Sequence, residues 1–209
     1  ANGGTCSARS LLVRYLSAYG ELPVPTREDY DFLGWFTAAE GGEKVTEETV
    51  LDTVPTQESP VKIYAHWKAR SCTVALDTCG GDPLDSITAP IDGVYGVLPV
   101  ATREGYTFDG WFTAADETGK QVKAGDAVDT EIKTLYAHWT ANTYKVRFET
   151  NEGSPAAEIT VTFDGKYTNL PITSRTGYTF AGWYTAAVDG MRVDETTTVT
   201  TAQDHTLYA

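Results

Sequence analysis

The sequence predicts a mainly β protein, α+β at most, built from three similar small domains. Three observations point to it. A six-residue phrase recurs, as Gly-Trp-Phe-Thr-Ala-Ala at residues 34–39 and 110–115 and as Gly-Trp-Tyr-Thr-Ala-Ala at 182–187. Between these phrases, alternating apolar and polar residues are typical of half-buried strands. Helical patterns are scarce, and a phrase repeated at a fixed period indicates an array of similar units.

A second phrase sets the length of the unit. Tyr-Ala-His-Trp ends at Trp67 and again at Trp139, 72 positions later. The first two Gly-Trp phrases lie 76 positions apart, so the first copy is four residues longer. We place the extra residues at 54–60, because proline and polar residues there favour an expanded loop.

A unit of this length is long enough for a small independent domain. The short linkers at 67–71 and 139–142 contain no glycine, which predicts an elongated, semi-rigid rod. The size relation for compact domains gives roughly 28 Å for each domain and roughly 85 Å for three in line. The expected domains are residues 1–69, 70–140 and 141–209.

The ends of the sequence give a further expectation. The opening strands expected at 73–77 and 144–150 have no counterpart in the first copy, and the third copy stops before its expected His-Trp. We therefore expect a segment of a longer protein, truncated at both ends. The first sheet would then expose an edge that another chain could fill.

The third copy shows the expected elements in order. The alternation at 144–150 predicts a strand, and 151–155 carries turn residues. A second strand at 159–163 would form a hairpin with the first. A third strand is expected at 178–184 and a last one from residue 206. Each copy would then form a twisted sheet of four or five strands.

Two details of this pattern can be checked against a structure. Strict alternation in the third strand places Phe180 and Gly182 on one face and Trp183 on the other. A glycine inside a strand needs a bulge or a close neighbour, and we expect the Trp183 ring to pack against Gly182. Helix is expected only as one or two turns, at 126–132 and 47–52.

Large aromatic side chains should supply much of the core, since burying one contributes about 1.5–3 kcal/mol. Recurrence also favours core packing for Tyr19, Tyr95 and Tyr167. A face that stacks glycans or binds a protein is the alternative for these three tyrosines. The residues predicted to be structural are Trp35, Trp67, Trp111, Trp139, Trp183, Gly34, Gly110, Gly182, Tyr106, Phe108, Tyr178 and Phe180. No ligand-binding residue can be named.

The formal net charge of −13 is spread along the chain, with no basic stripe. Nucleic acid and anionic membranes are therefore poor partners. No apolar run approaches 18 residues, so no membrane insertion is expected. We expect a monomer, with self-association through a sheet edge as the alternative.

The histidines do not form a catalytic arrangement in the sequence. His66 and His138 are equivalent residues of different copies, and His205 lies in the third copy. No serine, cysteine or carboxylate recurs beside them, so we expect them to be structural. No nucleotide, calcium or zinc motif is present, and no cofactor is expected. Calcium at the Asp116 loop is the one metal alternative considered.

The three cysteines also lack a repeated pattern. Cys72 and Cys79 bracket one predicted strand, which would hold them roughly 23 Å apart, too far for a disulfide. An odd number leaves at least one free thiol, and a link from Cys6 to the second copy is the remaining alternative.

The repeated phrases resemble a known family. Gly-Tyr-Thr-Phe-Asp-Gly-Trp-Phe-Thr-Ala-Ala at 105–115, closed by Leu-Tyr-Ala-His-Trp at 135–139, is similar to the Listeria–Bacteroides repeat, which includes the internalin B repeat. The third copy matches at 177–187, and the first departs mildly at 29–35. The resemblance implies a β-grasp, ubiquitin-related domain on secreted or cell-wall-attached bacterial proteins, with no catalytic residues.

These observations leave two functions open. The first is a non-catalytic stalk, or spacer, that presents another domain of a bacterial cell-surface protein. The second is an adhesion module that engages a host or neighbouring protein or glycan through a repeated surface. An enzyme is not expected, because nothing in the pattern requires a catalytic site in three copies.

Overall fold

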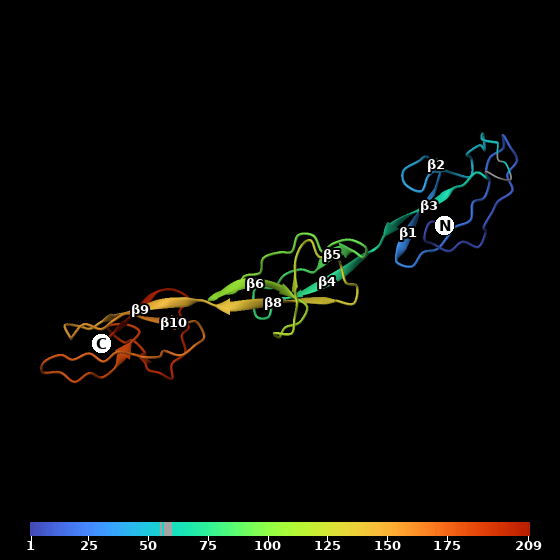
Figure 1. Cartoon of the computed structure of the whole chain (residues 1–209). Helices are drawn as coiled ribbons and strands as arrows, with labels where there is room; N and C mark the ends of the chain where they lie inside the picture. The colour runs from blue at the N-terminus through green and yellow to red at the C-terminus, as the bar shows by residue number, and fades with distance from the viewer. Residues whose placement is uncertain (55, 57–59) are drawn as a thin grey trace. The chain divides into compact units, whose positions relative to one another are not determined.

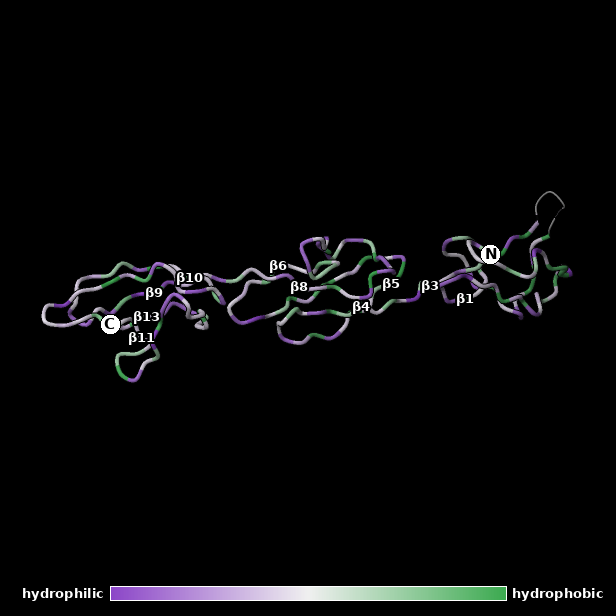
Figure 2. Tube along the Cα trace, turned by 90° about the horizontal axis from the view of Figure 1, so that it is seen from below, coloured by the Kyte–Doolittle hydropathy of each residue, from purple (hydrophilic) through white to green (hydrophobic). Residues whose placement is uncertain are grey.

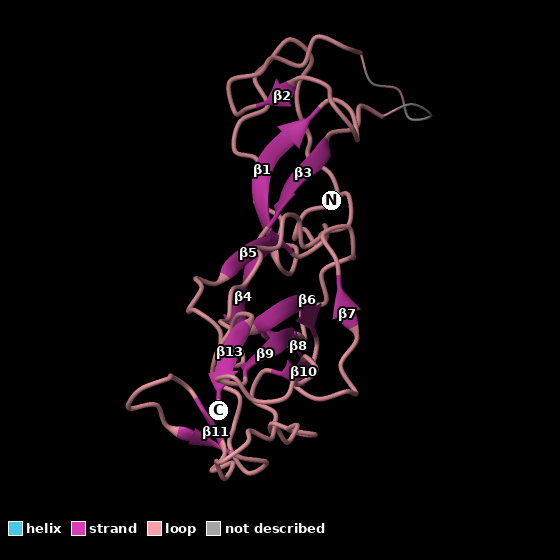
Figure 3. Cartoon of the chain, turned by 90° about the vertical axis from the view of Figure 1, so that its left-hand side faces the viewer, coloured by secondary structure: helices cyan, strands magenta, loops and turns pink. Residues whose placement is uncertain are grey.

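The computed structural model describes residues 1–54, 56 and 60–209, so the expected insertion at 54–60 lies partly outside the described residues. The described residues contain strands, turns and irregular segments but no helix (Figure 3). The helical turns expected at 126–132 and 47–52 are therefore wrong. Both segments form turns with a single β-bridge, Val94 to Ala127 and Ala18 to Val50. Their β-branched residues favour these extended bridges over a helix.

Three small sheets follow one another along the chain (Figure 1). The first has the order β2-β1-β3, the second β5-β4-β8-β6-β7, and the third β10-β9-β13-β11-β12. The strands are β1 (Tyr30–Phe36), β2 (Lys44–Val45), β3 (Tyr64–Ala69), β4 (Ser71–Asp77), β5 (Ile87–Pro90), β6 (Tyr106–Phe112), β7 (Gln121–Val122), β8 (Thr134–Ala141), β9 (Thr143–Glu149), β10 (Ile159–Thr162), β11 (Trp183–Tyr184), β12 (Arg192–Val193) and β13 (His205–Tyr208). The mainly β class with tandem small sheets is confirmed.

The second and third sheets share one topology. In each, the opening strand pairs in parallel with the closing strand, β4 with β8 and β9 with β13. The hairpin expected in the third copy is confirmed, because β9 and β10 pair antiparallel. The first sheet has three strands rather than the expected four or five, since it has no counterpart of β4 or β5 among the described residues.

By its internal contacts the chain divides into two compact units. One comprises residues 1–73, 88–96 and 125–131, and the other comprises 74–87, 97–124 and 132–209. This division passes through the second repeat and does not follow the expected domain limits. The division into three domains therefore stays a prediction.

The Gly-Trp strand carries a β-bulge at its glycine. Pairing with the neighbouring strand shifts register between Phe108 and Gly110, and Gly110 has a φ of 136°. The extra residue resets the alternation, so Phe108 and Trp111 lie on one face with ring centroids 5.5 Å apart. Phe180 and Trp183 are likewise 5.2 Å apart, and the opposite faces expected from strict alternation are wrong.

Apart from its chain neighbours, the residue nearest to a Cβ built at Gly182 is Arg192. The packing of the Trp183 ring on Gly182 stays a prediction. An indole ring does pack on bare backbone elsewhere: the Trp139 ring would lie 2.7 Å from a Cβ at Gly81. The Gly-Trp phrase carries a bulge in the first two repeats. The glycine that an indole ring covers, Gly81, lies in a separate turn.

The third Gly-Trp strand is shorter than expected. Only Trp183–Tyr184 is a strand, rather than 178–184. In the first repeat, the equivalent early residues pair with the end of the closing strand, Tyr30 with Ala69. In the third repeat, β11 pairs with β13 through Tyr184 beside Tyr208.

A buried tryptophan lies at the centre of each repeat. Trp35, Trp111 and Trp183 are 7%, 2% and 2% exposed. Each indole Nε1 donates to a proline carbonyl twelve residues earlier: Pro23 at 2.8 Å, Pro99 at 2.7 Å and Pro171 at 2.6 Å. A buried indole N–H needs an acceptor, so this bond explains why the Leu-Pro and Gly-Trp phrases recur together.

The other predicted core residues are less uniform. Trp67 and Trp139 are half-buried, and their Nε1 atoms donate to the carbonyls of Ala1 and Thr78. Tyr178 is 68% exposed, so its placement in the core is wrong. Apolar residues are spread along the described part of the chain (Figure 2). That part contains no helix long and apolar enough to cross a membrane.

Candidate interface between consecutive repeats

The histidine rings are held by structural contacts. His66 and His138 stack on Phe36 and Phe112 with centroids 3.9 Å apart in both cases. The Nε2 of His138 is 2.9 Å from the Ala114 carbonyl, and His66 makes the same contact with Ala38. These rings close the loop after the Gly-Trp strand.

His205 has a different environment. Its Nε2 lies 2.8 Å from the Tyr167 hydroxyl, and its Nδ1 lies 3.0 Å from the Gln203 carbonyl. Burial raises the pKa of Tyr167, which keeps this hydroxyl protonated. Tyr95 and Tyr167 are 5% and 4% exposed, while Tyr19 is half-buried beside its core.

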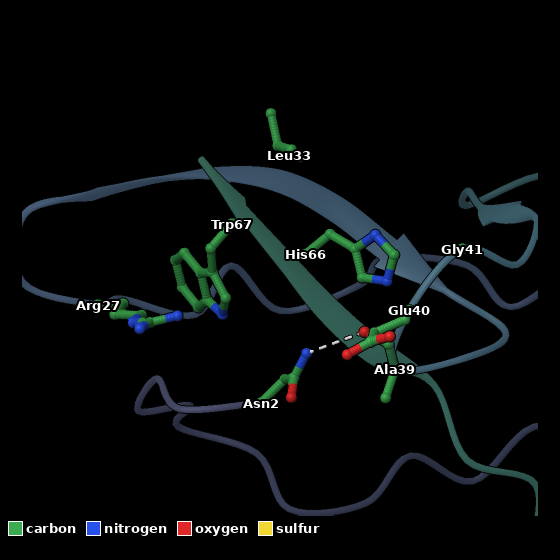
Figure 4. A pocket seen from close by; sticks show the side chains of 8 residues that line it. All are labelled: Asn2, Arg27, Leu33, Ala39, Glu40, Gly41, His66 and Trp67. Carbon is green, nitrogen blue, oxygen red and sulfur yellow. Dashed lines mark hydrogen bonds between the residues drawn. The ribbon is translucent and has the colours of Figure 1, made fainter. Parts of the chain in front are cut away.

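One shallow depression lies in the first repeat (Figure 4). It is lined by Asn2, Arg27, Leu33, Ala39, Glu40, Gly41, His66 and Trp67. Asn2 donates to the carbonyls of Ala39 and Ala65, at 3.3 Å and 3.1 Å. The His66 ring is engaged with backbone, so the depression offers no paired nucleophile and base.

Groups of acidic, histidine or cysteine residues able to hold a metal are absent from the described part of the chain. Asp116, the calcium alternative, accepts bonds from the Thr118 amide and hydroxyl, which lower the pKa of its carboxyl. It is therefore engaged in closing its own turn. All three cysteines are free, so the link from Cys6 to the second copy is absent.

The most regular polar site lies between consecutive repeats. The backbone amide and carbonyl of a single linker residue form hydrogen bonds with the preceding and the following repeat. Between the first two repeats, the Arg70 amide donates to the Asp29 carbonyl at 2.9 Å, and the Arg70 carbonyl accepts from the Ile91 amide at 3.0 Å. Backbone pairing on both sides fixes the φ and ψ angles of this residue.

The next junction repeats these bonds. The Asn142 amide donates to the Gly105 carbonyl at 2.9 Å, and the Asn142 carbonyl accepts from Phe163 at 2.9 Å. Asn142 is the counterpart of Arg70, 72 positions later, and Phe163 is the counterpart of Ile91. The geometry is therefore a property of the repeat and not of one sequence.

A tyrosine–aspartate pair completes each junction. The Tyr30 hydroxyl donates to Asp92 Oδ2 at 2.9 Å, and the Tyr106 hydroxyl donates to Asp164 Oδ2 at 2.7 Å. Donation to the carboxylate raises the pKa of both tyrosines. An arginine guanidinium also lies over each ring, for example Arg103 at 3.8 Å from the Tyr106 centroid.

Two contacting positions carry different side chains at the two junctions, and the two differences compensate in size. At the second junction, the Phe163 ring covers Gly105 and meets the Tyr106 ring edge-on at 5.7 Å. A Cβ at residue 105 would overlap the Phe163 ring. At the first junction, Asp29 and Ile91 occupy these two positions, so a side chain is accommodated where the apolar partner is smaller.

The third repeat contains the equivalent residues Arg175, Gly177 and Tyr178. Tyr178 is exposed, and nothing lies within 4 Å of a Cβ at Gly177. The Arg175 guanidinium still lies 4.3 Å from the Tyr178 centroid. The sequence prediction placed Tyr106 and Tyr178 in the core and missed the aspartate. Recurrence of a Phe-Asp or Ile-Asp turn 72 positions apart was the available signal.

Comparison with known proteins agrees with this repeat unit. The Listeria-Bacteroides repeat domain matches residues 1–66, 73–138 and 144–209. A "Putative Gly-rich membrane protein" of Evansella cellulosilytica is 32% identical over 76% of this chain and 19% of its own length. Internalin H of Listeria monocytogenes is 37% identical over 52% of this chain and 19% of its own length.

A "Putative membrane protein" of Evansella cellulosilytica is 29% identical over 88% of this chain and 28% of its own length. The chain spans less than a third of the length of each of these three relatives. No solved structure matches the chain. The family match covers nearly all of the sequence in three successive copies. The chain therefore belongs to the Listeria-Bacteroides repeat family.

Proposed function

We propose that the three repeats act as a non-catalytic spacer in a bacterial surface protein. One observation carries the proposal: the same bonded junction, with its linker residue and Tyr–Asp pair, occurs twice. A repeated, bonded junction resists bending better than a glycine-rich linker. The named relatives, two membrane proteins and an internalin, support a surface location.

Small-angle scattering of the purified chain tests the spacer. Three roughly 28 Å domains in line predict a maximum dimension of about 85 Å. Nitrogen-15 relaxation on the same sample should give one anisotropic tumbling behaviour for all repeats. A compact particle, or three repeats that tumble independently, would remove the basis for a rigid spacer.

A second function is supported by a separate observation. The residue after each Leu-Pro pair is apolar and exposed: Val24 at 73%, Val100 at 73% and Ile172 at 83%. A repeated exposed apolar contact suits an adhesion surface that gains avidity from several copies. These side chains contribute little to folding, so they can be changed without disturbing the repeats.

The adhesion function is tested by binding to arrays of host-cell glycans and surface proteins. The matched control is the triple variant Val24→Thr, Val100→Thr, Ile172→Thr, which keeps β-branched side chains at these exposed positions and reduces their apolar surface. Saturable binding that the triple variant loses supports adhesion. Absence of binding, or equal binding by both chains, leaves the spacer as the function.

A further inference from the structure

The strands by which the chain enters and leaves a repeat are neighbours in the sheet. In the second repeat, the opening strand β4 begins directly after the linker residue Arg70, and the closing strand β8 ends directly before Asn142. Leu76 of the first lies beside Leu135 of the second, in parallel register. The third repeat has the same arrangement, with β13 beside β9 (Figure 2). Tension along the chain therefore reaches these two strands first.

The parallel direction of this pairing decides how it responds to tension. Tension pulls the opening strand from its first residue and the closing strand from its last residue. In a parallel pair these two residues lie at opposite ends, so the strands must slide past each other and their hydrogen bonds are loaded together. Two strands that are pulled from the same end separate one bond at a time and resist less force.

The contacts that oppose sliding are extensive in the third repeat. Four residue pairs join β9 to β13. A fifth contact extends the ladder, because the Lys145 amide donates to Asp204 Oδ1 at 2.9 Å. Val146 on β9 and Leu207 on β13 are 0% and 1% exposed and belong to the same core. Sliding the strands therefore breaks the ladder and exposes apolar side chains in the same step.

We propose that the second and third repeats bear tension along the chain, each through its parallel pair of opening and closing strands. In the third repeat, β10, β11 and β12 lie between this pair in the sequence, so tension reaches them only after the pair has yielded. This role is independent of the spacer function, since a repeat on a flexible linker would resist tension in the same way. Scattering tests the spacer and pulling tests the load-bearing pair, so either can fail alone.

Single-molecule pulling of the full chain tests the proposal with two placements of the handles. Handles at Thr143 and Ala209 load β9 and β13 from opposite ends. Handles at Thr143 and Gln203, whose side chains are both exposed, load the two strands from the same end. The folded repeat is the same in both cases, and only the direction of the load differs. Release of the repeat lengthens the chain by roughly 200 Å, which identifies the event.

The rupture force at one loading rate should be at least about twofold higher with handles at Thr143 and Ala209, because the bonds of the pair then yield together. Equal forces in the two directions, or a higher force with the handle at Gln203, would overturn the proposal.

Two matched variants locate the resistance within the repeat. Asp204 and Asp194 each accept a backbone amide at 2.9 Å, from Lys145 and from Thr196 respectively. Only Asp204→Ala removes a bond of the loaded pair, so it should lower the rupture force between Thr143 and Ala209, whereas Asp194→Ala should leave that force unchanged. The same change in force for both variants would contradict a load borne by β9 and β13.

Discussion

The aromatic ring of Phe163 occupies the space where a side chain on Gly105 would begin. These residues belong to consecutive repeats and flank the linker residue Asn142, which bonds to both of their backbones. The junction can form in this geometry only if residue 105 has no side chain. The third repeat offers an internal comparison, because Gly177 has nearly the same φ, 81° against 78°, in open space.

The first prediction uses this matched pair. Gly105→Ala and Gly177→Ala both place a Cβ on a left-handed residue, which costs about 1–2 kcal/mol. Only Gly105→Ala also collides with Phe163, so it should lose about 1–3 kcal/mol more. Denaturant unfolding of both variants measures the difference. Equal losses would mean that the Phe163 contact does not constrain the junction.

The second prediction concerns the Tyr106 hydroxyl. Tyr106→Phe removes its bond to Asp164 and should cost about 0.5–1 kcal/mol, at the low end because the site is open to solvent. Tyr178→Phe is the control, since that side chain is 68% exposed. Chemical denaturation gives both values. A loss of equal size in the control variant would show that the Asp164 bond contributes nothing measurable.

The third prediction follows from the raised pKa of Tyr106. The neutral hydroxyl donates to Asp164, so the folded pKa lies above the ordinary value near 10. Its stabilising contribution is complete below that value and is lost as pH rises through the folded pKa. The stability difference between wild type and Tyr106→Phe should therefore shrink above about pH 10. A difference that grows with alkaline pH contradicts the assigned bond.

The fourth prediction separates packing from hydrogen bonding at the buried tryptophan. Trp111→Ala should cost about 3–5 kcal/mol, because it leaves a cavity in the core of its own repeat. Trp111→Phe keeps much of the apolar volume but leaves the Pro99 carbonyl without its donor, and it should cost less than the alanine variant. Differential scanning calorimetry reports both. A loss under 1 kcal/mol for alanine would show that Trp111 is not central to the core.

The strand pattern of the third repeat could be read from alternation, since Val146 and Phe148 face one side of a half-buried strand. The face of the strand on which Phe180 lies could not be predicted from alternation. In the first and second repeats, a bulge between the phenylalanine and the glycine of this phrase shifts the register of the strand. Gly182 has the same positive φ, 138°, and the Phe180 ring lies 5.2 Å from the Trp183 ring. A register shift leaves no trace in the composition of a strand, so alternation alone could not predict this arrangement.

The site shows a second limit of the sequence. Tyr106 and Tyr178 occupy the same position of the repeated phrase. Recurrence indicates that the two residues share a role, but it does not indicate whether that role lies within one repeat or between two repeats. The structure separates them, since one bonds Asp164 and the other is exposed. Contacts between successive copies depend on the neighbour, and a repeat considered alone does not contain that neighbour.

Amide hydrogen exchange at the two linker residues and their partners tests the central claim most directly. The amides of Arg70, Ile91, Asn142 and Phe163 all donate within the junctions. If the junctions are formed in solution, these four amides should exchange at least about a hundredfold more slowly than in an unstructured chain. Exchange at unstructured rates, in a chain whose core amides stay protected, would contradict the bonded junction and the spacer built on it.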